Sequence, residues 1–384
     1  MTFLILGCVC GCGKQENANE KSSAEKMKST EISAEQWEKG YDLPLNEKEK
    51  EEAENDCRER MELISDIYKS VDRENAFDVV LNDETILEMQ EKLAETKCPV
   101  ATLVTYSNMK NYESMDFFLK GCMDGKRDSI VFYEIYTDGG IGRMKFIFDG
   151  LDMYVVSARG MWNGNDKPGI CYISYTRIKG WKYTEKGWFC YELCVPEPPE
   201  VSEVMDGSCL LRITPMTEKM RELSKKCVQG LGYQGNNILC SNWDMDHMEE
   251  LDFNGMFEYL YAMKYQEKLS SEDYTDGVPK EVFESLIMEY FPITAEQIEE
   301  YAAFDEEKRT YVRKRFSCND RTFVGSCLPE VVAMKENEDG TVTLTVDAVC
   351  DVFISDDTFM THKLTVCFAE DGSFQYLGNE IVTE

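Results

Sequence analysis

The chain has 384 residues, of which 43% are hydrophobic, so it can bury a sizeable core and is long enough for two domains. Its 73 acidic residues against 41 basic ones give a formal net charge of -32, which repels phosphate backbones and anionic lipid headgroups. This composition excludes bulk disorder and argues against nucleic acid as a partner.

A short apolar run at the start of the chain, MTFLILGCVCGCGK, ends in small residues and cysteines. It is similar to the end of a bacterial lipoprotein signal, in which a peptidase cuts before a cysteine that then carries a diacylglyceryl group. Cys12, preceded by Val-Cys-Gly, fits that pattern best, and Cys8 is the second choice. The run is too short to span a bilayer, which needs roughly 20 apolar residues. We therefore predict a signal remnant over residues 1–11 and a lipid-anchored protein on the extracytoplasmic face of the cell membrane; the alternative is a cytosolic protein with an apolar N-terminus.

Residues 12–44 are polar and show no apolar period, which predicts a disordered tether. As a flexible coil, roughly 32 such residues would reach about 30 Å. This length is enough to hold a folded domain away from a membrane surface.

The elements expected in residues 45–215 are helices followed by strands. Apolar residues at spacings of three and four, from Ala53 to Val71, predict a core-facing helix that begins near Asn46. Two shorter helices are expected over residues 84–95 and 114–123. Segments rich in aromatic and β-branched residues then predict an antiparallel meander, with strands over residues 130–136, 143–148, 152–158, 170–178, 187–194 and 208–213. The GGIG sequence at 139–142 lies between two of these strands and lacks Gly-Lys-Ser/Thr, so it predicts a hairpin turn and not a phosphate-binding loop.

Residues 216–384 repeat that order. Helices are expected over residues 217–229, 256–269 and 279–290, and Thr294 with Gln297 forms a capping box for another short helix. Strands are expected over residues 331–335, 341–349, 361–368 and 373–378. The sequence thus predicts an α+β fold with two domains, 45–215 with an aromatic-rich antiparallel sheet and 216–384 with a C-terminal β-meander.

Five blocks of the sequence carry a resemblance to a known family: YDLPLNEKEKEEAENDC, TDGGIGRMKFIFDG, WFCYELCVPEPPE, GLGYQGNNILCSNWD and ENEDGTVTLTVDAVC. The chain resembles a family of uncharacterised lipoproteins from gut Clostridia of the Lachnospiraceae type, domain of unknown function 6070, over essentially everything after the tether. The resemblance implies a membrane-anchored, extracytoplasmic protein of a Gram-positive cell and carries over no catalytic residues. A wrapped sheet behind helices also resembles, more weakly, the nuclear-transport-factor-2-like fold, which says nothing about activity.

The 16 cysteines include no C-x-x-C pair, so neither a zinc site nor thioredoxin-like chemistry is indicated. Cys350 and Cys367 fall on strands that are expected to be neighbours. They form the pair that we predict as a disulfide.

A run of acidic residues between 242 and 252 offers the best candidates for a metal site, namely Asp244, Asp246 and His247. An EF-hand loop would need an oxygen ligand where Met248 stands and a glycine where Glu249 stands. An exposed acidic loop before a helix is therefore the favoured interpretation of this run.

Aromatic residues crowd the predicted first sheet, and Trp162, Tyr175, Trp181 and Trp188 are the candidates for a ligand-stacking surface. The alternative is an aromatic core, because alternation sends half of the side chains of a strand inward.

The function that we predict is a binding or interaction module without a cofactor, whose ligand is a protein, a peptide or a glycan. No Gly-x-Ser-x-Gly elbow occurs and only two histidines are present, which argues against an enzyme. A cell-wall or polysaccharide hydrolase that uses paired carboxylates is the alternative, and an accessory lipoprotein of a membrane complex is the third possibility.

Overall fold

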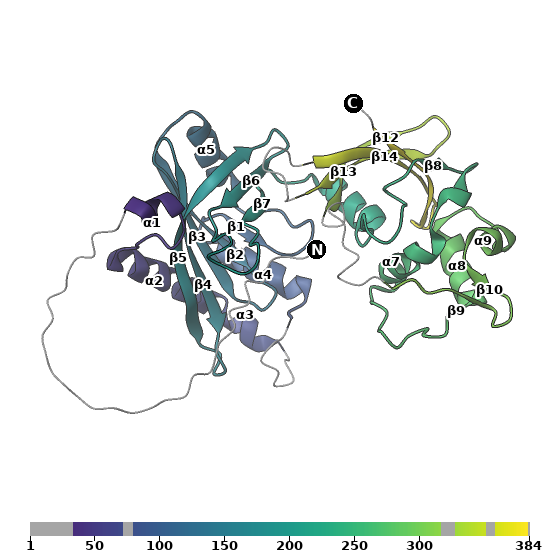
Figure 1. Cartoon of the computed structure of the whole chain (residues 1–384), viewed down its shortest axis with the longest axis horizontal. Helices are drawn as coiled ribbons and strands as arrows, with labels where there is room; N and C mark the ends of the chain where they lie inside the picture. Colours follow the sequence, from purple (N-terminus) through teal and green to yellow (C-terminus); the bar gives the residue numbers. More distant parts are fainter. Residues whose placement is uncertain (1–33, 72–79, 316–326, 351–357, 383–384) are drawn as a thin grey trace, which may run out of the picture.

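The structure is a computed structural model that describes residues 34–71, 80–315, 327–350 and 358–382. Within these ranges a seven-stranded and a five-stranded sheet lie side by side, each accompanied by helices (Figure 1). The α+β class predicted from the sequence is confirmed. No helix in the described ranges is long and apolar enough to cross a membrane. The two candidate lipidation residues, Cys12 and Cys8, lie outside the described residues.

The first half of the chain builds the seven-stranded sheet, in which the strand order follows the chain from β1 to β7. All neighbouring strands are antiparallel except β1 and β2, which are parallel. The predicted meander is therefore correct, and the three-residue β1 is too short to show a period in the sequence. The elements of this half are α1 (Ala34–Lys39), α2 (Glu47–Leu63), α3 (Ser65–Ser70), α4 (Asp83–Ala94), β1 (Val100–Thr102), α5 (Tyr112–Met123), β2 (Asp128–Ile135), β3 (Ile141–Phe148), β4 (Met153–Trp162), β5 (Pro168–Tyr183), β6 (Trp188–Leu193) and β7 (Ser208–Arg212).

The segment from α1 to Leu43 packs on this sheet. The ring of Trp37 on α1 lies edge-on to Tyr154 and Tyr175, with centroids 6.4 and 6.3 Å away. Leu43 donates its backbone N–H to the carbonyl of Tyr175 at 2.9 Å. The structure thus differs from the predicted tether over residues 34–43, because one tryptophan supplies an apolar contact that the polar composition of the segment concealed.

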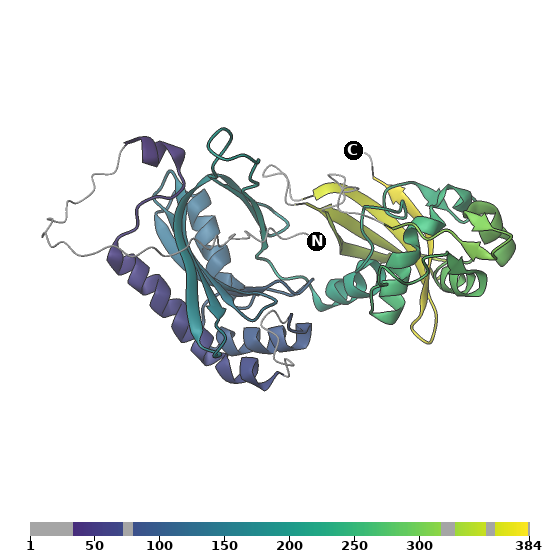
Figure 2. The same cartoon turned by 60° about the horizontal axis from the view of Figure 1, so that its bottom comes forward.

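The seven-stranded sheet is curved, and helices cover both of its faces (Figures 1 and 2). On the face that we call the concave face, α5 contributes Met115, Phe118 and Leu119 to a core shared with Phe132 and Phe146 of the sheet. On the outer face, α2 and α4 pack against the alternate side chains of the same strands. The alternation of side chains along each strand therefore gives two separate cores to one sheet.

Arg143 fixes α2 to the outer face. Its side chain is 1% exposed, and its guanidinium donates to Asp56 at 2.7 Å and to Glu52 at 3.0 Å, both on α2. A buried guanidinium needs such partners, because an unpaired charge in the interior costs several kcal/mol. The sequence could not show this contact, since the partners stand about 90 residues apart.

The second half of the chain builds the five-stranded sheet, whose order is β12-β13-β14-β15-β8. The capping box predicted at Thr294 and Gln297 is present at the start of α9. A smaller sheet joins β10, β11 and β9. The elements are α6 (Glu218–Leu223), the π-helix η1 (Ser224–Val228), β8 (Trp243–Asp244), the 3-10 helix η2 (Met248–Glu250), α7 (Phe253–Tyr265), β9 (Val278–Pro279), α8 (Lys280–Tyr290), α9 (Ala295–Tyr301), β10 (Phe304–Asp305), β11 (Thr310–Tyr311), β12 (Leu328–Glu336), β13 (Val342–Val349), β14 (Thr358–Phe368) and β15 (Phe374–Ile381).

Two ion pairs with buried carboxylates join the halves. Arg212 on β7 donates from Nη1 to both carboxylate oxygens of Glu330, at 2.6 and 2.8 Å. Lys186 donates from Nζ to Asp347 at 2.8 Å. Glu330 and Asp347 are each only 2% exposed, so the first half supplies the cations that these acids need.

Apolar contacts accompany the ion pairs at this joint. Tyr106, which follows β1, lies in the core of the second half and donates its hydroxyl to the carbonyl of Pro329. Trp188, Cys190 and Val349 form a further small buried cluster between the two sheets. Both polar and apolar contacts therefore hold the halves together.

The predicted disulfide between Cys350 and Cys367 is wrong. Cys350 follows the end of β13, where Val349 is opposite Thr358, whereas Cys367 stands at the other end of the hairpin, one residue from the partner of Val342. At about 3.3 Å per residue the two cysteines are roughly 30 Å apart, and a disulfide requires Cα atoms within about 7 Å. The two strands are neighbours, as predicted, but their antiparallel register places Cys350 and Cys367 at opposite ends of the strand pair.

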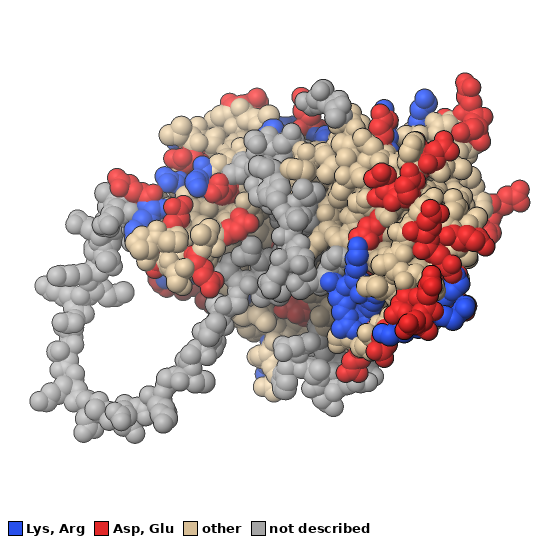
Figure 3. All heavy atoms as spheres, turned by 45° about the vertical axis from the view of Figure 1, so that its right-hand side comes forward, with Lys and Arg blue, Asp and Glu red and all other residues tan. Residues whose placement is uncertain are grey.

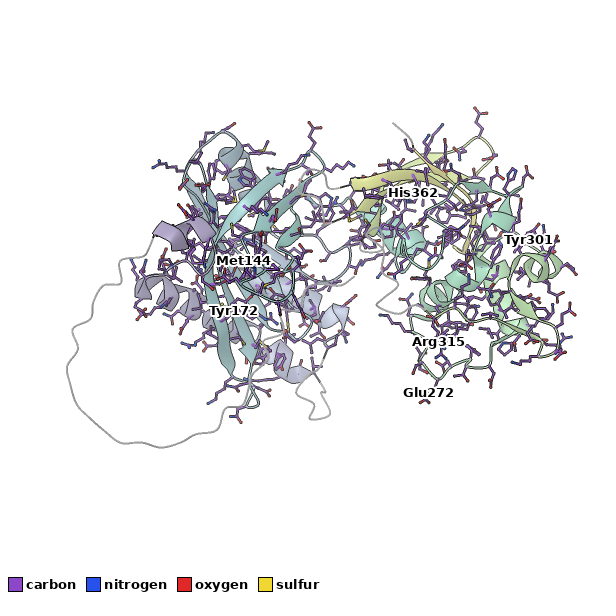
Figure 4. The ribbon with its side chains drawn as sticks, viewed as in Figure 1. Met144, Tyr172, Glu272, Tyr301, Arg315 and His362 are labelled. Carbon is purple, nitrogen blue, oxygen red and sulfur yellow. The ribbon has the colours of Figure 1, made fainter. Side chains whose placement is uncertain are left out.

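His362 is a fully buried titratable group of the second sheet, with 0% exposure (Figure 4). The amide nitrogen of Asn379 donates to the carbonyl of Ser241 at 2.9 Å, so its oxygen faces His362 Nδ1 at 2.6 Å. Nδ1 therefore carries the proton, and Nε2 accepts from the hydroxyl of Tyr233 at 3.0 Å. The neutral ring is fully satisfied, and burial lowers the pKa of His362 to about 4.

This burial predicts a pH dependence of stability. Because the folded pKa of about 4 lies below the unfolded value of 6.5, the contribution of neutral His362 is complete above pH 6.5 and is lost as the pH falls toward 4. Relative to His362→Gln, the free energy of unfolding of the wild type should fall by up to about 3 kcal/mol across this window. Denaturant unfolding of both proteins from pH 7 to pH 4 measures the difference, and a difference that stays constant would contradict the assignment.

Candidate functional site

The concave face changes from apolar to polar along its strands. The register places Ile130, Phe146, Val155 and Thr176 in one cross-strand row, and Phe132, Met144, Ser157 and Ser174 in the next. The following row is Glu134, Gly142, Arg159 and Tyr172. α5 covers the apolar rows, whereas Met144, Ser157 and Ser174 are half-buried and Tyr172 is 46% exposed. Figure 4 shows Met144 and Tyr172 on this sheet. We call the group Glu134, Tyr136, Ser157, Arg159, Tyr172 and Ser174 the polar end of the concave face.

A glycine makes room for an aromatic ring at the polar end. A Cβ atom at Gly142 would stand 2.8 Å from the hydroxyl oxygen of Tyr136 and 2.9 Å from its Cε2. The phenol of Tyr136 therefore lies across Gly142, close to the backbone of β3. Its ring in turn supports Arg159, whose guanidinium carbon is 3.6 Å from the ring centroid.

Arg159 has one nitrogen engaged and one without a protein partner. Nη2 donates to both carboxylate oxygens of Asp138, at 2.8 and 2.7 Å. Nη1 is enclosed but makes no hydrogen bond to the described part of the chain. A donor in that state costs about 1 to 3 kcal/mol, and such groups in native proteins call for a partner. Nη1 is thus the strongest single indication of a binding site on this face.

Glu134 stands in the same row as this arginine, two strands away across Gly142 of β3. Burial raises the pKa of its carboxyl, while the nearby Tyr136 hydroxyl and Arg159 guanidinium oppose that rise. Burial raises the pKa values of Tyr136 and Tyr191, and the charge of Glu134 adds to both rises, so these side chains share one electrostatic environment. Buried acids with a raised pKa and a specific charged partner occur preferentially at functional sites.

A β-bulge lies at the edge of the cluster. Arg159 is opposite Tyr172, but the next residue of β4, Gly160, is opposite Ile170, so Cys171 is the extra residue on β5. Bulges are common beside sites, where they change the direction of a side chain. Here the bulge keeps Tyr172 in register with Arg159 at the more exposed end of the sheet.

The four aromatic residues predicted as a stacking surface do not come together. Trp162 stacks on Tyr68 and donates Nε1–H to the carbonyl of Gly139 at 2.8 Å. Trp181 packs against the concave core, and Trp188 lies 7% exposed at the joint between the halves. Tyr175 lies on the outer face beside Trp37. These four residues therefore pack against other side chains, as the alternative of an aromatic core predicts. A more exposed ring of the meander is that of Tyr172.

Of the predicted metal candidates, the structure brings Asp244 and His247 together. His247 Nδ1 lies 2.8 Å from Asp244 Oδ1, and the hydrogen bond to this carboxylate raises the pKa of His247. Asp246 contributes a backbone N–H to the same oxygen at 2.9 Å. Among the residues that the structure describes, no group of three or more His, Cys, Asp or Glu side chains is arranged to hold a metal ion. The pair is exposed, as expected for an acidic loop.

The same pair borders a surface hollow of about 530 Å³ over the outward side of the five-stranded sheet. Its charged lining residues are exposed, and Lys363 and Glu380 stand 3.9 Å apart. Acidic side chains are spread over the second half on the face shown in Figure 3, and basic ones occupy a smaller area. Exposed ion pairs of this kind contribute little energy, so this hollow is a weaker candidate than the polar end of the concave face.

The chain is an α+β protein in which the concave face of a curved, largely antiparallel sheet ends in a polar cluster. The chain matches the model of a "Family of unknown function (DUF6070)" over residues 50–384, and it belongs to that family. The predicted resemblance to domain of unknown function 6070 is confirmed, while the lipoprotein character stays a prediction. Neither the curated proteins nor the solved structures contain a match to the chain.

The contact between Gly142 and Tyr136 yields a prediction. Gly142→Ala should destabilise the protein by about 1 to 3 kcal/mol, because the new methyl group displaces the phenol. In a Tyr136→Ala background the same change should cost less, since the overlapping ring is gone. Urea unfolding of the double-mutant cycle measures this coupling. Gly121→Ala on α5, where a Cβ atom would meet nothing within 4 Å, is the matched control, and equal costs in both backgrounds would refute the contact.

Proposed function

We propose that this protein is a lipid-anchored, extracytoplasmic binding protein that takes a ligand on the polar end of the concave face. The proposal rests on the enclosed Nη1 of Arg159, which makes no hydrogen bond to the described residues although Glu134 is close enough to feel the charge of the guanidinium. A ligand oxygen at this position would satisfy the guanidinium.

The construction of the cluster supports a binding role. Arg159 is held from two sides, by the carboxylate of Asp138 and by the ring of Tyr136. A side chain fixed in this way loses little further conformational freedom when a ligand binds. The polar end stands on strands of a sheet whose other rows form a packed core, which gives it a rigid base.

The hydrolase alternative is less well supported at this face. A glycosidase needs two carboxyl groups about 5 to 10 Å apart, one of which acts as an acid and the other as a base or nucleophile. Burial raises the pKa of Glu134, which is the direction that a general acid needs. Asp138, however, has both oxygens engaged by Arg159, and one of them also accepts from the N–H of Gly140. Such a carboxylate is a positioning group and a poor base.

The membrane location rests on the sequence of the first fourteen residues, and a single measurement tests it. Mass spectrometry of the N-terminal peptide, from the full chain isolated from membranes of its native host, should find a diacylglyceryl group on Cys12. Lipidated Cys8 would keep the anchor and move the cleavage site. An unmodified chain that retains Met1 in the cytosolic fraction would contradict the anchor.

The binding role is tested by thermal unfolding with a panel of small ligands: neutral sugars, dicarboxylates, amino acids and polyamines. At least one class should raise the melting temperature of the wild type by several degrees at saturating concentration. The rise should disappear in Arg159→Met and persist in Arg309→Met, whose arginine is exposed. A panel in which no class shifts the wild type would count against the proposal.

A further inference from the structure

We propose that the ligand of the polar end is a neutral sugar ring, whose hydroxyl groups bond to Arg159, Glu134 and the serines of the face while the ring packs on Tyr172. This inference rests on the proposed function and specifies the chemical class of the ligand. Three features of the face support it, namely its mixture of donors and acceptors, its charge balance and its exposed ring.

The polar end offers both kinds of hydrogen-bonding group within two adjacent rows. Arg159 Nη1 is a donor, and Glu134 in the same row has carboxyl oxygens that accept. Ser157 and Ser174, opposite each other in the next row, can each donate and accept. A sugar hydroxyl also donates and accepts, so it can bridge such groups. Glu134 accepts from the Tyr136 hydroxyl and keeps further acceptor sites, which a ligand with only acceptors would leave unused.

The charge balance disfavours ionic ligands. Asp138 holds Arg159 through both carboxylate oxygens, so the positive charge of the guanidinium is already offset. An anionic ligand would approach Glu134 as well as the net negative surface of a chain with charge -32. A cationic ligand would place its own N–H donors against the N–H donor of Arg159 Nη1, which only an acceptor can satisfy. A neutral polar ligand avoids both penalties.

Tyr172 supplies an apolar surface at the more open end of the row. It is 46% exposed and stands opposite Arg159 on the neighbouring strand. Aromatic rings bury a large area at little cost in conformational entropy, and the C–H faces of a sugar pack well on them. Water could also accept from Arg159 Nη1, but a water molecule would gain nothing from the apolar ring of Tyr172.

Isothermal titration of the full chain tests the ligand class with three probes of one shape: methyl β-glucoside, which is neutral, glucuronate, which is anionic, and glucosamine, which is cationic. Methyl β-galactoside and N-acetylglucosamine extend the neutral set. We expect a neutral sugar to bind more tightly than both charged analogues. The three probes share the glucopyranose ring, and the charged group stands at C6 in glucuronate and at C2 in glucosamine.

Three variants locate the binding. Tyr172→Ala should weaken binding of the neutral sugar about 2- to 12-fold, and Tyr172→Phe should retain it, because the ring and not the hydroxyl is used. Arg159→Met should weaken binding about 10-fold or more. Tyr265→Ala, which removes a ring that is 52% exposed on α7, is the matched control. Circular dichroism of each variant establishes that it is folded.

The outcomes separate this inference from the proposed function. If glucuronate or glucosamine binds more tightly than every neutral sugar, or if only a class without a sugar ring binds, the sugar inference is overturned and the binding role stands. If sugars bind but Tyr172→Ala and Arg159→Met bind them as the wild type does, the polar end is not their site. If no ligand of any class binds, both are overturned.

Discussion

The ion pairs between Arg143 and the carboxylates of α2 determine how the first half is arranged. They hold α2 on the outer face of the curved sheet, with a guanidinium that is 1% exposed. Because side chains alternate between the two faces of a strand, a fixed outer face also fixes which residues point to the concave side. A register shift of one residue would move Arg143 to the concave face and Gly142 and Met144 to the outer face, so neither face could pack. The ion pairs of Arg143 therefore support the same register that places the polar end on the concave face.

One sheet thus serves two purposes along the same strands. The rows under α5 are apolar and supply core stability, whereas the rows beyond α5 carry Ser157, Arg159 and Glu134. Buried polar groups lower stability unless they are paired, so a fold retains an incompletely paired donor only where something compensates for its cost. The second half is joined to this unit by ion pairs in which its own buried acids, Glu330 and Asp347, depend on cations of the first half. That dependence favours a single rigid unit over two free domains.

The order of elements followed from the sequence because each long helix and strand has its own period, as in the stripe from Ala53 to Met61 on α2 and the capping box at Thr294. The candidate site could not be predicted from the sequence, because its side chains come together only through the geometry of the sheet. Alternation shows that Ser157 and Arg159 share a face, but the row that joins Glu134, Arg159 and Tyr172 depends on register across four strands and on a bulge at Cys171. Serine and arginine in an otherwise apolar strand, and Gly142 inside a strand, were the available signals. The predictions for Trp162 and Trp188 rested on the number of aromatic residues in the sheet, because the sequence does not show which face each ring occupies.

If Arg159 Nη1 donates to the ligand, a crystal structure of the full chain grown with methyl β-glucoside will show the contact. We predict a sugar hydroxyl oxygen about 3 Å from Nη1, with the sugar ring against Tyr172. Sugar bound elsewhere, with only water at Nη1, would contradict the claim.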